Sequence, residues 1–308
     1  MNKITIVGAG RVGESAAHNL AKAELCREIV LIDIKEGVPQ GTALDIQESA
    51  PIFHFDTTLS GSNDLHAMAG SELVIITAGI PRKPGMSRSD VLDTNLAVVN
   101  DIVDTLIKTA PKAMLLMVTN PVDVLTYAAW KRSGFPRARI FGMAGVLDSA
   151  RMASFIAMET GFSVRDITAM VLGGHGDTMV PMTRFTCING IPIEHFLSKE
   201  QIHKIVERTR GGGAEILSLR KTASAYDAPA AAIAAMVNSI SHDRRHILPG
   251  VAVLQGEYGL HDISMGVPIV FGENGVEQVI ELPLTPDEAT EFKRSAAIIQ
   301  ADIARLKK

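Results

Sequence analysis

Over the first 145 residues, short apolar runs alternate with stretches that have the periodicity of an α-helix. The apolar runs are Ile4–Val7, Ile29–Ile32, Leu73–Thr77 and Ala113–Thr119, and the clearest helical stretches are Val12–Ala23 and Leu92–Ala110. Nearly continuous apolar strands that are separated by helices are typical of a parallel sheet covered on both faces. We therefore predict a doubly wound α/β sheet whose strands all end at one edge, where such sheets bind ligands.

The pattern changes after about Gly145, where strands and helices are segregated rather than alternating, so we predict an α+β region there. The expected helices cover 148–160, 228–240, 286–306 and a stretch from 199, and the expected strands lie near 167–172, 179–188, 251–254, 267–271 and 276–281. Three consecutive glycines, Gly211–Gly213, favour a bend or break in the helix that begins at Lys199. We place the two expected domains at 1–144 and 145–308.

Composition excludes several classes of protein. The chain has 308 residues, of which 46% are hydrophobic and 21% charged, so a large core is expected rather than disorder. The net charge of −4 gives no electrostatic case for a nucleic-acid partner. There is no apolar stretch of membrane-spanning length and no signal-peptide pattern near Met1, and the two cysteines are far apart, so we expect a cytoplasmic protein. The histidines show no metal-ligand spacing, and we expect no metal site.

The motif Gly8-Ala9-Gly10-Arg11-Val12-Gly13 directly follows the first expected strand. Such glycines allow a tight turn, close approach of a pyrophosphate and close packing of helix on strand, as in a Rossmann-type dinucleotide site. Asp33 follows the next strand and can accept hydrogen bonds from the adenosine ribose, which favours NAD over NADP. The alternatives are a strand–helix turn without a ligand and a solvated carboxylate.

Three further segments carry groups suited to catalysis. His175 lies in a glycine-rich turn, Gly173–Asp177, and imidazole is the usual proton carrier near neutral pH. Asp148 and Arg151 share one helix face, either as site residues or as a helix cap with an intrahelical ion pair. The cationic loop Gly79–Arg88 follows a strand end and suits an anionic substrate, although a solvated surface loop has the same composition.

Together, these segments resemble the lactate/malate dehydrogenase superfamily along the whole chain. The matching motifs are Gly8–Gly13, Ile80–Arg88, Val118–Pro121, Gly142–Arg151 and Gly173–Asp177. The sequence Pro-Arg-Lys-Pro-Gly-Met at 81–86 resembles that of the lactate-dehydrogenase-like malate dehydrogenases.

The resemblance implies roles for the polar residues of these motifs. His175 would exchange a proton with the substrate oxygen, and Asp148 would hold its imidazole. Arg151 would grip the carboxylate beside the reacting carbon. Arg88 would polarise the carbonyl from a closing loop, and Arg82 would pair with a second carboxylate.

The resemblance also implies a cofactor site and one departure from the family pattern. Asn120 would bond the substrate and orient the nicotinamide, and the Asn120–Pro121 peptide would be cis. The residues expected to bind NAD are Gly8, Gly10, Arg11, Val12, Gly13, Asp33, Asn95 and Asn120. Asp227 replaces an expected uncharged residue near the substrate pocket, so we expect its side chain to point to solvent or to a subunit contact.

The implied function is reversible hydride transfer between (S)-malate and NAD, giving oxaloacetate and NADH, as in the tricarboxylic acid cycle. The alternatives are a dehydrogenase for lactate or another 2-hydroxy acid, and an NAD-binding protein without catalysis. The implied partners are a small dicarboxylate and further copies of the chain, as a dimer or tetramer, with no nucleic acid and no membrane.

Overall fold

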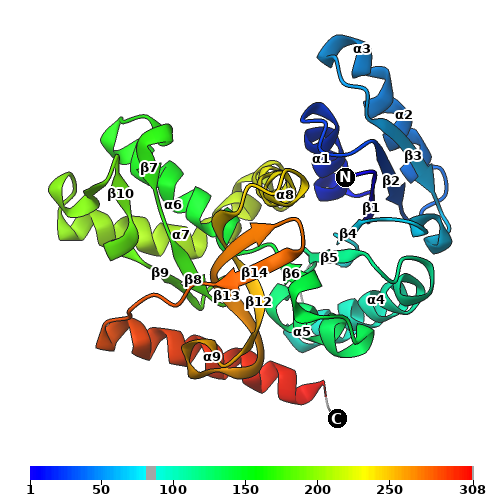
Figure 1. Cartoon of the computed structure of the whole chain (residues 1–308). Coiled ribbons are helices and arrows are strands. Elements are labelled where there is room, and N and C mark those ends of the chain that lie inside the picture. The colour runs from blue at the N-terminus through cyan, green and yellow to red at the C-terminus, as the bar shows by residue number, and fades with distance from the viewer. Residues whose placement is uncertain (81–87, 307–308) are drawn as a thin grey trace.

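The computed structural model describes residues 1–80 and 88–306 (Figure 1). Its strands are β1 (Lys3–Val7), β2 (Glu28–Ile32), β3 (Thr58–Ser62), β4 (Leu73–Ile76), β5 (Met114–Met117), β6 (Ile140–Gly142), β7 (Ile167–Thr168), β8 (Val171–Gly173), β9 (Met179–Pro181), β10 (Cys187–Ile188), β11 (Ile191–Pro192), β12 (His246–Gln255), β13 (His261–Gly272) and β14 (Gly275–Val279). Its α-helices are α1 (Arg11–Lys22), α2 (Val38–Glu48), α3 (Ala50–Phe53), α4 (Arg88–Thr109), α5 (Val122–Ser133), α6 (Gly145–Thr160), α7 (Lys199–Arg220), α8 (Asp227–Ser241) and α9 (Pro286–Arg305).

Within the described ranges, eleven strands form one sheet that runs through both halves of the chain. The first six strands are parallel in the order β3-β2-β1-β4-β5-β6, and β6 then pairs antiparallel with β12, which leads to β13, β8 and β9. The order reverses beside β1, so the carboxyl ends of β1 and β4 border the crevice where such sheets take ligands. The predicted Rossmann-type sheet with a following α+β region is confirmed.

The apolar residues of the strands account for this arrangement. All four residues of β4 and of β5 are buried, as expected of parallel strands with helices on both faces. One core cluster extends from Ile4 to Ile303, and Phe141 of β6 packs edge-on against Phe271 of β13 with ring centroids 5.2 Å apart. The first half of the chain (blue to cyan) and the second half (green to red) therefore share a sheet and a core (Figure 1).

Several helices begin where their sequences provide caps. Ser198 and Gln201 form a capping box at the start of α7, and Thr285 and Glu288 do so at α9, each satisfying backbone N–H groups that the helix leaves free. The helix α5 ends at Gly134, whose left-handed φ of 65° suits glycine. Among residues 1–80 and 88–306, none of the helices combines the length and the apolar character that a membrane-spanning helix needs.

Two expectations for the second half are wrong in detail. The expected strands at 167–172 and 179–188 are each divided, because Ile167–Thr168 and Cys187–Ile188 pair in a separate small sheet with β11. The expected break at Gly211–Gly213 does not occur, since α7 continues from Lys199 to Arg220. Glycine can adopt helical angles, and a Cβ at Gly212 would come 3.1 Å from Cδ of Arg151. Gly212 thus allows α7 to lie close to α6.

This contact predicts different effects for two neighbouring substitutions. Gly211 is exposed, and a Cβ added there would meet no described atom within 4 Å, so Gly211→Ala should stabilise the protein by about 0.5–1 kcal/mol through helix propensity. Gly212→Ala gains the same propensity but crowds Arg151, so its melting temperature should rise less or fall. Thermal unfolding of both variants measures this difference. A loss of stability in Gly211→Ala would contradict an uninterrupted helix.

Candidate functional site

The glycine turn after β1 is shaped by contacts that exclude side chains. Gly8 has a φ of 113°, and a Cβ there would lie 2.5 Å from the backbone nitrogen of Ala78. A Cβ at Gly13 would lie 1.9 Å from the carbonyl oxygen of Gly8, so helix and strand pack as closely as their backbones permit. At Gly10, by contrast, no described atom lies within 4 Å of where a Cβ would be. The turn therefore leaves open space at the amino end of α1, where a phosphate group fits.

Asp33 lies beside this turn. It follows β2, and its Oδ2 accepts a hydrogen bond from the backbone nitrogen of Ala9 at 2.9 Å, while Oδ1 accepts one from the backbone nitrogen of Lys35 at 3.0 Å. The structure thus brings a carboxylate to the glycine turn, as the dinucleotide pattern predicts.

A cleft of about 790 Å³ connects this turn with the catalytic candidates. Its lining includes eight of the predicted site residues: Gly10, Arg11, Val12, Gly13, Asn95, Asn120, Arg151 and His175. Gly8, Asp33 and Asp148 are not among its lining residues, but Gly8 belongs to the same turn, Asp33 bonds to Ala9 of that turn, and Asp148 bonds to His175. Arg82 and the side chain of Arg88 lie outside the described residues, although α4 begins at Arg88.

Two asparagines stand on the wall of the cleft. Asn95 is only 1% exposed, and its amide is bonded to the chain itself: Oδ1 accepts from Ile80 N at 2.8 Å and Nδ2 donates to the carbonyl oxygen of Asn120 at 2.7 Å. It therefore joins the loops after β4 and β5. Asn120 is exposed, its Oδ1 accepts from Val122 N at 3.4 Å, and the Asn120–Pro121 peptide is cis, as predicted.

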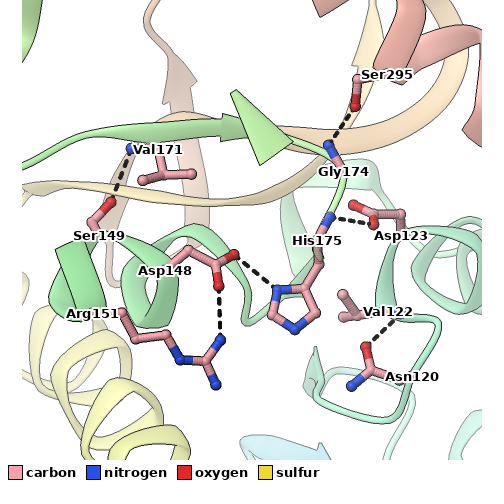
Figure 2. Close-up of polar contacts among 10 residues, drawn as sticks. All are labelled: Asn120, Val122, Asp123, Asp148, Ser149, Arg151, Val171, Gly174, His175 and Ser295. Atoms are coloured by element: carbon pink, nitrogen blue, oxygen red, sulfur yellow. Dashed lines mark hydrogen bonds and ion pairs between the residues drawn. The ribbon is translucent and has the colours of Figure 1, made fainter. Parts of the chain in front are cut away.

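Asp148 links the two cationic candidates (Figure 2). It lies in the first turn of α6 and is 1% exposed; its Oδ2 is 2.8 Å from His175 Nδ1, and its Oδ1 accepts from Arg151 Nη1 at 3.2 Å. An ionised carboxylate only accepts, so Nδ1 carries the proton and Nε2 is the nitrogen directed at the space between Arg151 and Asn120.

The surroundings of His175 change its affinity for a proton. Burial alone would lower its pKa, but the charge and hydrogen bond of Asp148, together with the charge of Asp123, raise the pKa above the ordinary 6.5 despite an opposing effect of Arg151. These surroundings therefore favour the imidazolium form more than water does.

Arg151 is held both by its hydrogen bond to Asp148 and by packing against α7. Its side chain is 12% exposed, and Gly212 of α7 approaches its stem. Its Nε is buried without a hydrogen-bond partner among the described residues. A buried guanidinium with donors to spare suits an anionic, planar ligand such as a carboxylate.

The turn that carries His175 is fixed by two residues that the sequence patterns did not single out. Ser295 of α9 accepts a hydrogen bond from Gly174 N at 2.8 Å, and Asp123 of α5 accepts one from His175 N at 2.9 Å (Figure 2). Asp123 follows Asn120–Pro121 closely, but in sequence it resembles an ordinary acidic residue of a first helical turn. Ser295 has no local signal, because it comes from a helix near the end of the chain.

Two further expectations concern Asp227 and metal binding. The side chain of Asp227 is 72% exposed and pairs with Arg220 at 3.4 Å, in agreement with the expectation that it points away from the pocket. Across 1–80 and 88–306, no group of three or more His, Cys, Asp or Glu side chains is placed to hold a metal ion.

Comparison with known proteins adds a family to this geometry. Residues 2–142 match the family model of the lactate/malate dehydrogenase NAD-binding domain, and residues 145–308 match that of the lactate/malate dehydrogenase α/β C-terminal domain. The malate dehydrogenase of Thioalkalivibrio sulfidiphilus is 66% identical over 307 residues, which cover 100% of both chains.

Solved structures agree with these matches. The malate dehydrogenase of Salinibacter ruber superposes with a TM-score of 0.95 at 45% identity, covering 99% of this chain and 97% of that one. A lactate dehydrogenase of Cryptosporidium parvum, solved with lactic acid and nicotinamide adenine dinucleotide, has a TM-score of 0.95 at 38% identity and covers 100% and 98%. With both halves matched and relatives similar over their full length, the chain belongs to the lactate/malate dehydrogenase family.

Proposed function

We propose that this protein is an NAD-dependent malate dehydrogenase, which interconverts (S)-malate and oxaloacetate. The observation that carries the proposal is the buried Asp148, bonded at once to His175 and Arg151, on a cleft that continues to the glycine turn at Gly10. This arrangement combines a proton carrier, a carboxylate-binding cation and a dinucleotide cradle within one cleft.

NAD fits the residues on the other side of the cleft. The open space at Gly10 and the free amino end of α1 suit the pyrophosphate, and Asp33 suits a ribose without a 2′-phosphate. Asn95, Asn120, Arg11 and Val12 also line the cleft and would lie beside the bound cofactor, with the two asparagines next to the nicotinamide. When bound, the nicotinamide supplies or accepts the hydride, and the protein provides orientation and charge.

The proton is handled by His175. In the direction of reduction, the imidazolium donates the proton on Nε2 to the substrate oxygen, and in oxidation the neutral ring takes it back. Asp148 keeps the proton on Nδ1 and stabilises the charged ring. Arg151 binds the carboxylate next to the reacting carbon, and Arg88 stabilises the developing negative charge on oxygen.

Two alternatives share the fold. A lactate dehydrogenase would use the same histidine and arginines, and the likeness to the Cryptosporidium parvum enzyme covers this whole chain, so fold alone does not choose between substrates. A protein that binds NAD without catalysis would have no need of the buried pair of Asp148 and His175. The malate assignment rests on the names of relatives above 60% identity and on Arg82.

We extend the proposal to the setting of the enzyme. The division at 144/145 separates a cofactor-binding half from a catalytic half. Cys26 and Cys187 are both free thiols, which suits a reducing compartment such as the cytoplasm. We propose a homo-oligomer, dimer or tetramer, acting in the tricarboxylic acid cycle. Sedimentation of the purified protein tests the assembly.

His175→Asn should lower kcat by roughly 10²–10⁴-fold, the usual contribution of general acid–base catalysis, because the variant has no group to exchange the proton. NADH binding, measured by fluorescence titration, should remain near that of the wild type. A variant that keeps a third of the wild-type turnover would exclude His175 as the proton carrier.

Asp148→Asn should shift the pH dependence of the reaction. Since Asp148 raises the pKa of His175, removing its charge lowers that pKa, and oxaloacetate reduction should then decline at a lower pH than in the wild type. The measurement is kcat/KM for oxaloacetate across the acid, neutral and alkaline range. Unchanged midpoints with a lower melting temperature would mean that Asp148 has only a structural role.

Arg82→Gln should change the choice of substrate. Oxaloacetate and pyruvate share the end that Arg151 would bind and differ in a second carboxylate. Loss of one partner of a desolvated ion pair costs about 2–5 kcal/mol, or roughly 30- to several-thousand-fold in selectivity. The ratio of oxaloacetate to pyruvate activity, followed by the absorbance of NADH, should fall accordingly.

Lys83→Gln is the matched control, because it removes the adjacent cation and should leave that ratio nearly unchanged. NADPH in place of NADH tests the cofactor in the same assay. The assignment would be overturned if the wild-type protein reduced pyruvate at the same rate as oxaloacetate. It would also be overturned if Lys83→Gln changed the ratio of oxaloacetate to pyruvate activity and Arg82→Gln did not.

A further inference from the structure

A second carboxylate, that of Asp123, lies behind the catalytic turn. Asp123 is in the first turn of α5 and only 6% exposed, and its Oδ2 accepts the backbone N–H of His175 at 2.9 Å (Figure 2). Its Oδ1 is also buried and has no hydrogen-bond partner among the described residues. One carboxylate oxygen is therefore committed to the turn, and the other has no donor there to stabilise its charge.

The backbone of Asp123 is itself held in place. Its carbonyl oxygen accepts a hydrogen bond from the hydroxyl of Ser264 in β13. Asp123 thus connects three elements: α5, β13 and the turn at Gly174–His175. Because its carbonyl oxygen is bonded to β13 and its Oδ2 to the turn, Asp123 can fix the position of His175.

The charge of Asp123 needs a separate explanation from its hydrogen bond. The adjacent amide, that of Gly174, is held by the neutral hydroxyl of Ser295 at 2.8 Å, so a neutral acceptor is sufficient for this task. A buried ionised carboxylate is unfavourable unless a positive charge compensates it. The only group on the turn that gains a positive charge during the proposed reaction is the imidazole of His175.

The ionisation of the two groups is coupled. Burial raises the pKa of Asp123 to about 6, against the effects of the His175 amide and of the His175 charge, and Asp148 raises it further. In return, Asp123 raises the pKa of His175. The protonation of each group therefore depends on the charge of the other.

The other charged groups around the imidazole come from the remaining walls of the cleft. Asp148 and Arg151 belong to α6, and the charged residues that also line the cleft in the described ranges are Arg11, Asp177 and Arg210. Arg210 of α7 is neutralised by Glu207 and Glu291. Asp148 and Asp123 are thus the two carboxylates that act directly on His175.

We propose that Asp123 is a positioning residue for His175, whose carboxylate holds the backbone of the catalytic turn and supplies a second negative charge that stabilises the imidazolium. The part of the proposal that concerns catalysis rests on the proposed role of His175 as the proton carrier. Asp123 does not touch substrate; it acts through His175.

Two substitutions separate the charge from the hydrogen bond. Asp123→Asn keeps an oxygen that accepts from the amide of His175 but removes the charge, whereas Ser295→Ala removes the neighbouring anchor without changing any charge. The histidine rings are labelled with ¹³C and titrated by NMR, and the signal of His175 is assigned by its absence in His175→Asn. Asp148→Asn shows how far the pKa of His175 falls when a carboxylate bonded directly to the ring loses its charge.

The pKa of His175 should fall by about 0.5 or more in Asp123→Asn, a threefold or larger change in its ionisation constant, and should stay within about 0.2 of the wild type in Ser295→Ala. The pH midpoints of oxaloacetate reduction and of malate oxidation should both move to lower pH in Asp123→Asn. If the substitution only disturbed packing, it would lower the rates but would not move the pH midpoints of both reactions to lower pH. An unchanged pKa of His175 in Asp123→Asn would overturn the proposal.

A reciprocal measurement needs no change at position 123, in case Asp123→Asn fails to fold. The Asp123 carboxyl is labelled at ¹³Cγ and titrated in the wild type and in His175→Asn. Its pKa should be higher in His175→Asn, because the variant has no imidazolium to favour the carboxylate. Identical titrations would refute the coupling.

These titrations do not depend on turnover. A wild-type protein that reduces neither oxaloacetate nor pyruvate would overturn the proposed function, while the titrations would still decide whether Asp123 controls the ionisation of His175.

Discussion

The site depends on one buried carboxylate, Asp148, which is shared by an imidazole and a guanidinium. Alone in the interior, its charge would be strongly unfavourable, and its two cationic partners make it tolerable. Because the two partners bond different oxygens, their relative positions are set by a single rigid group. The separation of the His175 imidazole from the Arg151 guanidinium therefore follows from the placement of one side chain at the start of α6.

The scaffold around Asp148 is built for close approach. Gly212 allows α7 to lie close to Arg151, and Gly8 and Gly13 allow α1 to pack closely on β1, so glycines permit close packing on each side of the cleft. The sheet and core continue through β6 into β12, which holds the cofactor side and the catalytic side in one framework. Hydride transfer requires such a framework, since donor and acceptor must be aligned closely.

The dinucleotide side was accessible from sequence because its signals are local. A glycine turn must follow its strand, and Asp33 must follow the next one, so spacing along the chain was sufficient to predict both. The strands β3 and β6 and the helices α2 and α5 were not anticipated, because short or mixed segments lack a clear period. The expected break at Gly211–Gly213 was wrong because the flanking turns and the contact with α6 outweigh the weak helix propensity of glycine.

The sequence by itself determined the parallel sheet, the glycine turn with its acidic partner, and the candidates His175, Asp148 and Arg151. Only the tertiary structure decided how these candidates combine. Asp148 bonds both His175 and Arg151, and the amide of Asn95 bonds to the backbone of Asn120. The side chain of Asp227 points outward, and Asp123 and Ser295 hold the turn that carries His175. The physical reason is that the contact of His175 with Asp148 joins residues 27 positions apart, and that of Gly174 with Ser295 joins residues 121 positions apart. The outward direction of Asp227 depends instead on which face of its helix is buried. Local pattern contains neither kind of information.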